Sequence, residues 1–281
     1  MQTRIIRSRN AEYQRFQVLK TNRNKRYRYG EFFVEGVRNL NAAVRFGWHI
    51  SSLLYPSHRP LSGWARELLD SQPTDVNYEL SPELMDELSG KDDGSELMAV
   101  VRMRPDNFDQ LACKEPPLLA LFDRPSNRGN LGTILRSCDA LGVDGLILTG
   151  HGVDPYDPEV VVSTMGSFFK VPVIRVPEND AVMRFMAQMR QRYPDFQAVG
   201  TTAHQQKPLR DVDLTRPTLL MIGNETDGLC RAFKECCDVL ATIPMNPSSY
   251  ASSFNVGCAA TVLFYEAARQ RAGLPAFQSR K

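Results

Sequence analysis

One segment of the chain, FDRPSNRGNLGTILRSCDALG at residues 122–142, sets asparagines and glycines at the start of a predicted helix. The apolar residues of this helix recur on one stripe, and Arg136 falls outside it. Because helical side chains lean toward the N-terminus, the Arg136 guanidinium can reach back toward Asn130. With the helix start, these two side chains could hold a phosphate or an RNA backbone. An asparagine cap followed by a solvated arginine explains the same pattern.

A second segment, LLMIGNETDGLC at residues 219–230, places polar side chains directly after an apolar run. It sets Asn224 and Glu225 between Gly223 and Gly228. Glycines at such positions let the backbone approach a ligand closely or adopt a positive φ. A plain strand-to-helix turn explains them almost as well.

The third segment, residues 243–271, indicates a strand end, a serine-rich polar loop and a helix. We expect the helix to open at Ser252 or Ser253, which puts Ser253 and Asn255 in its first turn. Taken alone, both are ordinary capping residues.

Common cofactor and metal motifs are missing from the sequence. There is no G-x-G-x-x-G after a strand and no G-x-x-x-x-G-K-[ST], which disfavours a dehydrogenase and a P-loop NTPase. There is no H-E-x-x-H, and the four histidines (His49, His58, His151 and His204) are too far apart for a local metal motif. The six cysteines form no C-x-x-C pair, so we expect reduced thiols and no metal site.

The elements that must position these segments are continuous apolar runs. The predicted strands of the second half are 118–123, 145–150, 171–176, 197–202, 218–223 and 239–245. Strands buried on both faces indicate a parallel sheet covered by helices, and ligands of such sheets bind beyond the carboxyl ends of the strands. The site is therefore expected in the loops that follow Asp123, Gly150, Thr202, Gly223 and Met245.

The first hundred residues indicate a smaller α/β unit. Its predicted helices are 10–21, 36–47, 61–69 and 81–90, and its predicted strands are 32–36, 50–56, 76–80 and 96–103. A polar, proline-containing stretch at 104–117 follows. We place a first domain at 1–107, a linker at 108–117 and a second domain at 118–281.

Charge is concentrated at the start of the chain. Residues 1–50 contain eleven lysines and arginines against three glutamates, a net charge of +8 in a chain whose total is +2. Such a basic end suits a polyphosphate partner. The stretch KTNRNKRYRYGEFF interleaves these cations with Tyr27, Tyr29, Phe32 and Phe33, which could stack on unpaired bases. A solvated basic helix and loop with core aromatics is the alternative.

Composition is that of a folded globular chain: 281 residues, 42% apolar and 23% charged. No run approaches the roughly 20 apolar residues of a membrane span, and the charged start is unlike a signal peptide. We expect a cytoplasmic protein with no membrane partner.

In this order, the three segments closely resemble the motifs of the SpoU (TrmH-like) branch of the SPOUT RNA methyltransferases. The matching parts are N-x-G-x-x-x-R from Asn130, G-N-E-x-x-G-L from Gly223, I-P-M from Ile243 and S-[LF]-N-V from Ser253. Phe254 stands where the family usually has leucine, and Asn246-Pro247 replace the usual glycine-rich start of that loop. The basic first hundred residues resemble the ribosomal-protein-like substrate-binding domain of many members.

The resemblance implies a parallel-sheet catalytic domain with a deep trefoil knot, preceded by a smaller α/β RNA-binding domain. It implies methylation of a ribose 2′-hydroxyl with S-adenosylmethionine, in a homodimer whose site lies near the subunit interface. The cofactor-binding positions are Thr201, Thr202, Gly223, Asn224, Gly228, Ile243, Met245 and Ser253. The catalytic positions are Asn130, Arg136, Glu225, Ser253 and Asn255. A bulky residue at Gly223 should then fill the cofactor slot and leave the fold largely intact.

The counterpart of Arg136 in this family is a proposed base, activated with the help of an RNA phosphate. A free guanidinium cannot accept a proton, so binding the adjacent phosphate and stabilising oxyanion charge is an equally physical role. Positioning alone can supply about 7–11 kcal/mol of the barrier to methyl transfer.

The two-domain layout favours ribosomal RNA over transfer RNA as substrate, by analogy. Two other classes of protein fit the sequence less well. A non-catalytic RNA-binding protein would not need three intact strand-end loops. A Rossmann-type enzyme would not need the basic end.

Overall fold

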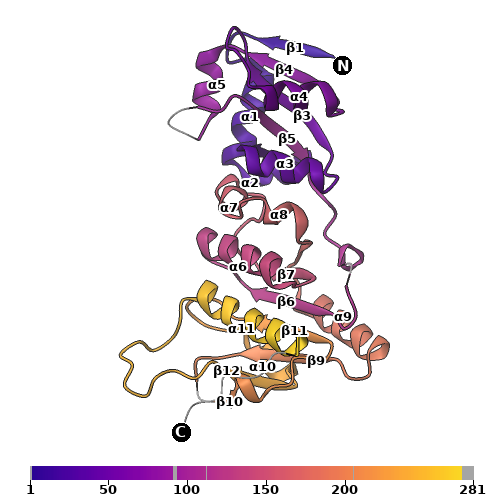
Figure 1. Cartoon of the computed structure of the whole chain (residues 1–281), viewed down its shortest axis with the longest axis vertical. Helices are drawn as coiled ribbons and strands as arrows, with labels where there is room; N and C mark the ends of the chain where they lie inside the picture. Colours follow the sequence, from indigo (N-terminus) through magenta and orange to yellow (C-terminus); the bar gives the residue numbers. More distant parts are fainter. Residues whose placement is uncertain (1, 91–93, 112, 205, 274–281) are drawn as a thin grey trace. The chain divides into compact units, whose positions relative to one another are not determined.

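The computed structural model describes residues 2–90, 94–111, 113–204 and 206–273 (Figure 1). The chain forms two compact units: unit 1 is Met1–Arg104 with Asp154–Lys170, and unit 2 is Pro105–Val153 with Val171–Lys281. The segment Asp154–Lys170 therefore lies within the expected second domain in sequence but packs with the N-terminal unit. Residue 112 of the expected linker and residues 274–281 of the expected second domain lie outside the described residues.

Unit 1 is built on a five-stranded sheet in the order β1-β4-β3-β5-β2. Strands β1, β4 and β3 run parallel, and β5 runs antiparallel to both β3 and β2. The elements are β1 Thr3–Ile6, α1 Ala11–Thr21, α2 Arg23–Tyr29, β2 Glu31–Glu35, α3 Val37–Arg45, β3 Ile50–Pro56, α4 Gly63–Ser71, β4 Asn77–Leu80, α5 Pro82–Leu88, β5 Met98–Arg102, α7 Pro158–Ser163 and α8 Ser167–Lys170. All eight elements expected between residues 10 and 103 are present. Strand β1 and helix α2 were not predicted as separate elements.

Alternation along β2 gives unit 1 two apolar layers. Phe33 packs with the buried side chains of α1 and α5. Phe32 points the other way, into an aromatic cluster with Trp48 from the N-terminal segment and Phe168 and Phe169 from α8. The Trp48 indole donates a hydrogen bond to the carbonyl of Phe169 at 2.8 Å. Segment 154–170 thus completes the core of unit 1.

A buried ion pair also holds this segment. Arg26 is 1% exposed and donates from Nε and Nη2 to Oδ2 of Asp154, at 2.8 and 2.7 Å. The Tyr27 hydroxyl donates to the other Asp154 oxygen at 2.6 Å. Losing one partner of such a pair costs about 3–5 kcal/mol, because the other charge stays buried without compensation.

Unit 2 contains a seven-stranded sheet in the order β10-β12-β9-β11-β6-β7-β8, and every pairing is parallel. The prediction of a parallel sheet in an α/β fold is confirmed. The elements are η1 Phe108–Gln110, β6 Leu118–Asp123, α6 Arg128–Leu141, β7 Gly145–Thr149, β8 Val173–Val176, α9 Asn179–Arg192, β9 Gln197–Thr201, β10 Lys207–Pro208, η2 Leu209–Asp211, β11 Thr218–Ile222, α10 Arg231–Cys236, β12 Val239–Thr242 and α11 Val256–Arg271.

The central strands β6, β7 and β11 are buried along their whole length. Helices α9 and α10 cover them with an apolar cluster that includes Phe185, Met186 and Phe233. Helices α6 and α11, far apart in sequence, lie side by side (Figure 1), and the hydroxyls of Ser137 and Thr261 are 2.7 Å apart between them. This brings the first and third predicted segments together. Within the described ranges, no helix is long and apolar enough to span a membrane.

Candidate active site

A cavity of about 250 Å³ opens beyond the carboxyl ends of β9, β11 and β12 in unit 2. This is where a parallel sheet is expected to bind its ligand. All eight residues expected to bind the cofactor line it: Thr201, Thr202, Gly223, Asn224, Gly228, Ile243, Met245 and Ser253. The second and third segments therefore meet around one cavity, and no residue of the first segment lines it.

The two glycines of the loop after β11 have different roles. Gly228 has a φ of +68°, a conformation that favours glycine. At Gly223 a Cβ atom would lie 2.1 Å from the backbone nitrogen of Leu229, so the loop folds back onto this glycine. The expectation that a bulky residue at Gly223 leaves the fold intact is wrong, because its side chain would meet backbone before it reached the cavity.

The side chain of Asn224 shapes its own loop. Its Oδ1 accepts from the amides of Thr226 and Asp227 at 2.8 and 3.2 Å, and its Nδ2 donates to the carbonyl of Arg124 at 2.7 Å. The Thr201 hydroxyl is also engaged internally, since it donates to the carbonyl of Met221 at 3.0 Å. These two side chains are therefore engaged within the chain itself.

At the start of α6, one asparagine caps the helix and a second one binds other residues of the site. Asn127 is the N-cap, and its side chain accepts from the amide of Asn130 at 2.9 Å. The Asn130 side chain is thereby left to donate to Glu225 at 3.2 Å and to accept from Asn255 at 3.1 Å. Three of the expected catalytic residues thus form one hydrogen-bonded cluster.

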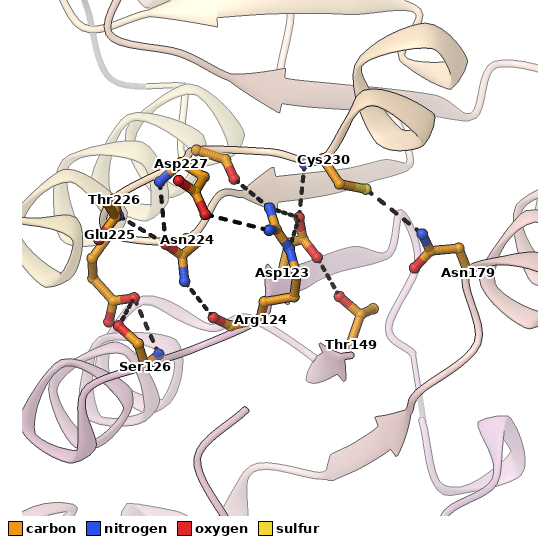
Figure 2. Close-up of polar contacts among 11 residues, drawn as sticks. Asp123, Arg124, Ser126, Thr149, Asn179, Asn224, Glu225, Thr226, Asp227 and Cys230 are labelled. Atoms are coloured by element: carbon orange, nitrogen blue, oxygen red, sulfur yellow. Dashed lines mark hydrogen bonds and ion pairs between the residues drawn. The ribbon is translucent and has the colours of Figure 1, made fainter. Parts of the chain in front are cut away.

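The Glu225 carboxylate is the hub of this cluster. One oxygen accepts from the amide and the hydroxyl of Ser126, at 3.1 and 2.7 Å, and the other from Asn127 N and Asn130 Nδ2, both at 3.2 Å (Figure 2 shows Ser126). Partial burial acts to raise the pKa of Glu225, but the hydrogen bonds from Ser126 and Asn130 outweigh it and lower the pKa below its usual value. Glu225 is therefore a carboxylate at neutral pH that braces two loops.

The third segment starts its helix later than expected. Helix α11 begins at Val256 with Asn255 as its N-cap, whose Oδ1 accepts from the amides of Gly257 and Cys258 at 2.9 and 3.3 Å. The expected opening at Ser252 or Ser253 is wrong, because the Asn255 side chain satisfies the free amides of the first turn. Ser253 remains in the loop, exposed at the cavity.

Arg136 lies on α6 outside the buried stripe, as expected, and is exposed. It does not line the cavity, and it forms no hydrogen bond or ion pair with the residues that the structure describes. Its guanidinium is thus available to another molecule.

Sequence reasoning missed three residues at the end of β6. Ser126 binds Glu225, and Asp123 and Arg124 contact the loop after β11 (Figure 2). The only signal in the sequence was an acidic and a basic residue at the end of a predicted strand, a pattern also typical of solvated turns.

The basic N-terminal stretch is only partly available to a ligand. Phe32 and Phe33 are buried, so for these two rings the alternative of core aromatics is confirmed. Tyr27 is engaged by Asp154. Tyr29 is 42% exposed with the Arg15 guanidinium 5.4 Å from its ring centre, and Arg28 beside it is exposed.

Across the described residues, no three His, Cys, Asp or Glu side chains are grouped to hold a metal ion. The cavity is lined instead by apolar side chains such as Ile243, Met245 and Leu263, together with the backbone of a glycine loop. An apolar slot with a few fixed polar groups suits an adenine-containing cofactor. Fold and site together define an α/β enzyme that binds its cofactor at the ends of parallel strands.

The chain belongs to the SpoU rRNA Methylase family. The model of that family matches residues 117–265, and the model of the SpoU L30e-like domain matches residues 10–99.

Similar proteins extend over nearly the whole chain. A 23S rRNA (uridine(2479)-2′-O)-methyltransferase of Streptomyces viridochromogenes is 47% identical over 95% of this chain and 93% of its own length. The crystal structure of the SpoU methyltransferase AviRb from Streptomyces viridochromogenes, in complex with AdoMet, superposes with a TM-score of 0.89 and 45% identity over 95% of this chain and all of that one. An AdoMet-bound rRNA methyltransferase from Sinorhizobium meliloti gives a TM-score of 0.83 and 26% identity, covering 96% of this chain and 99% of that chain.

Proposed function

We propose that this protein uses S-adenosylmethionine to methylate a ribose 2′-hydroxyl in ribosomal RNA. The observation that carries the proposal is the meeting of one strand-end cavity, lined by all eight expected cofactor residues, with the Asn130–Glu225–Asn255 cluster. Glu225 belongs to both, because it lines the cavity and binds Asn130.

Bound in the cavity, the cofactor supplies a methyl group activated by its sulfonium. The chain's own contribution is positioning: the backbone of 223–228 and the side chains of Ile243 and Met245 form the slot. The Asn130–Glu225–Asn255 cluster fixes the wall beside it. Because both Glu225 oxygens already accept hydrogen bonds, we assign this carboxylate to positioning rather than to proton transfer.

We assign Arg136 to the RNA. A guanidinium offers five donors and no acceptor, so it suits a phosphate or a developing oxyanion and does not suit a base. Its exposure and its lack of a partner among the described residues fit a side chain that meets its ligand only in the RNA complex.

Unit 1 supplies a cationic surface for the RNA. Arg28 and Arg38 are exposed and pair with none of the residues placed by the structure, and Tyr29 presents an exposed ring. Cations beside an exposed aromatic suit unpaired nucleotides. The 23S rRNA named for the relatives is the first substrate to test.

The homodimer expected from the family has a candidate surface on α11. Cys258, Val262 and Tyr265 recur at helical spacing on its exposed side, and Phe254 lies just before it. An apolar stripe on the solvent side of a helix favours burial against a partner. We propose that two copies meet there, close to Ser253 and the cavity.

Calorimetry with S-adenosylmethionine tests the placement of the cofactor. Ala259 lines the cavity from α11, so Ala259→Phe should fill the slot from the helix side and weaken binding by about tenfold or more. Ala272→Phe, at the exposed end of the same helix, is the matched control. Equal affinity of the wild type and Ala259→Phe would place the cofactor elsewhere.

A further inference from the structure

The last residue of β6 and the one after it make an unusual turn. Arg124 has a φ of +51°, in the left-handed region that residues with side chains rarely adopt. Gly150, beside it, has no side chain, and a Cβ there would lie 2.6 Å from Cγ of Arg124. A non-glycine residue held in this conformation points to a requirement for its side chain.

The Arg124 side chain and backbone both hold the loop after β11. The guanidinium donates from Nη2 to the carbonyl of Gly228 at 2.9 Å, with Nη1 3.7 Å from the Asp227 carboxylate. The Arg124 carbonyl accepts from Nδ2 of Asn224 at 2.7 Å. One residue thus contacts both ends of the tight turn 224–228 (Figure 2).

Asp123 fixes the guanidinium in turn. It is 1% exposed, and its Oδ2 accepts from Nε and Nη2 of Arg124 at 3.2 and 3.1 Å. The same oxygen accepts from the amide of Cys230 at 2.8 Å, and Oδ1 accepts from the Thr149 hydroxyl at 2.9 Å. All of these contacts are drawn in Figure 2. The carboxylate therefore orients the arginine and holds the far end of the loop.

We infer that Arg124 is a positioning residue that sets turn 224–228 in the shape that receives S-adenosylmethionine. The inference rests on the proposed placement of the cofactor, since Asn224, Gly228 and Leu229 of this loop line the cavity and Arg124 does not. The role needs an arginine, because only a planar fork reaches the Asp123 carboxylate and the Gly228 carbonyl together.

The test separates positioning from folding by using glycine. Arg124→Gly removes the guanidinium but relieves the left-handed backbone, and Asp123 keeps the Cys230 amide and the Thr149 hydroxyl as donors. The unfolding midpoint of the ligand-free chain should therefore fall only slightly. The dissociation constant for S-adenosylmethionine, measured by calorimetry on the full chain, should rise by about tenfold or more. Arg124→Lys should bind as weakly as Arg124→Gly. Arg175→Gln, which breaks another arginine–aspartate ion pair of unit 2, should bind normally.

Arg124→Gly or Arg124→Lys binding within about twofold of the wild type would overturn the inference. So would a loss of affinity in Arg124→Gly accompanied by a matching fall in its unfolding midpoint, which is the signature of a purely structural residue. A wild-type chain that fails to bind S-adenosylmethionine would instead contradict the proposed function, and the inference with it.

Discussion

At the scale of single residues, the site contains side chains that bind one another and one side chain that binds none of the residues described by the structure. Asn130, Glu225 and Asn255 form the first kind, and Arg136 is the second. Substitutions in the cluster should lower stability, whereas substitution of Arg136 should lower methyl transfer.

Arg136→Ala should fold and bind S-adenosylmethionine normally, because the side chain is exposed and lies away from the cavity. Methyl transfer should fall by about 10²–10³-fold, the usual loss when a donor to a developing negative charge is removed. Arg136→Lys should recover little, since lysine cannot bind a phosphate through two parallel hydrogen bonds. The check is single-turnover transfer of labelled methyl to RNA, with Arg184→Ala, another exposed arginine in unit 2, as control. Near-normal transfer by Arg136→Ala would remove Arg136 from the active site.

Glu225→Gln should loosen the cluster in a pH-dependent way. The pKa of Glu225 is lowered in the folded chain, so its contribution to stability is present above the ordinary carboxyl pKa and is lost as pH falls through the lower folded value. The wild type should therefore exceed Glu225→Gln in free energy of unfolding by about 1 kcal/mol at pH 7, with the difference shrinking below about pH 4. Chemical denaturation at several pH values measures this. A difference that is constant down to pH 3 would contradict the account.

Two residue-level findings lay beyond the sequence pattern. The motif contains two asparagines at one helix start, and only the structure assigns the cap to Asn127 and frees Asn130. The glycine at position 223 suggested that the backbone approaches a ligand closely there. In the structure, the backbone of Leu229 occupies the space that a side chain at Gly223 would need. The role of each residue follows from a contact in the folded chain: Asn127 binds the amide of Asn130, and Leu229 packs against Gly223.

At the scale of elements, buried strands could be predicted from the sequence and an exposed strand could not. The strands β6, β9 and β11 were expected to within a residue or so, because continuous apolar runs leave few other structures. Strand β1 was missed because it is an edge strand with three of its four residues exposed and no apolar run. The packing of segment 154–170 with unit 1 could not be predicted from the expected bounds 118–281, because apolar residues show that a segment is buried and not which sheet it packs on.

The exposed stripe of α11 gives an element-scale prediction. Val262→Glu should convert the proposed dimer to a monomer, because a charge would be buried at the contact. Light scattering after size-exclusion chromatography measures the mass. Val37→Glu, at an equally exposed valine in unit 1, should leave the mass unchanged. A wild-type chain that is already monomeric, or a Val262→Glu dimer, would show that this face is not the interface.

At the scale of the whole molecule, the chain passes three times between its two units. Deleting residues 1–104 would remove the N-terminal partners of Phe168, Phe169 and Asp154, so a truncated catalytic unit should be unstable. The contribution of unit 1 is better tested by point substitutions in the full chain.

Arg28→Gln with Arg38→Gln should weaken RNA binding and flatten its dependence on salt. Each lost phosphate contact should reduce the slope of log K against log salt by about 1. Binding titrations at several salt concentrations measure the slope, and Arg210→Gln, an exposed arginine of unit 2, is the control. An unchanged slope would show that these two arginines are ordinary solvated surface.

The most direct test of the central claim is transfer of labelled methyl from S-adenosylmethionine to ribosomal RNA by the purified protein, followed by digestion to nucleosides. We predict label in a single 2′-O-methylated nucleoside, formed about 10²–10³-fold more slowly with Arg136→Ala. Label on a base would contradict the assignment of this cavity and cluster to ribose methylation. The absence of label, both with free ribosomal RNA and with RNA assembled in ribosomal subunits, would also contradict it.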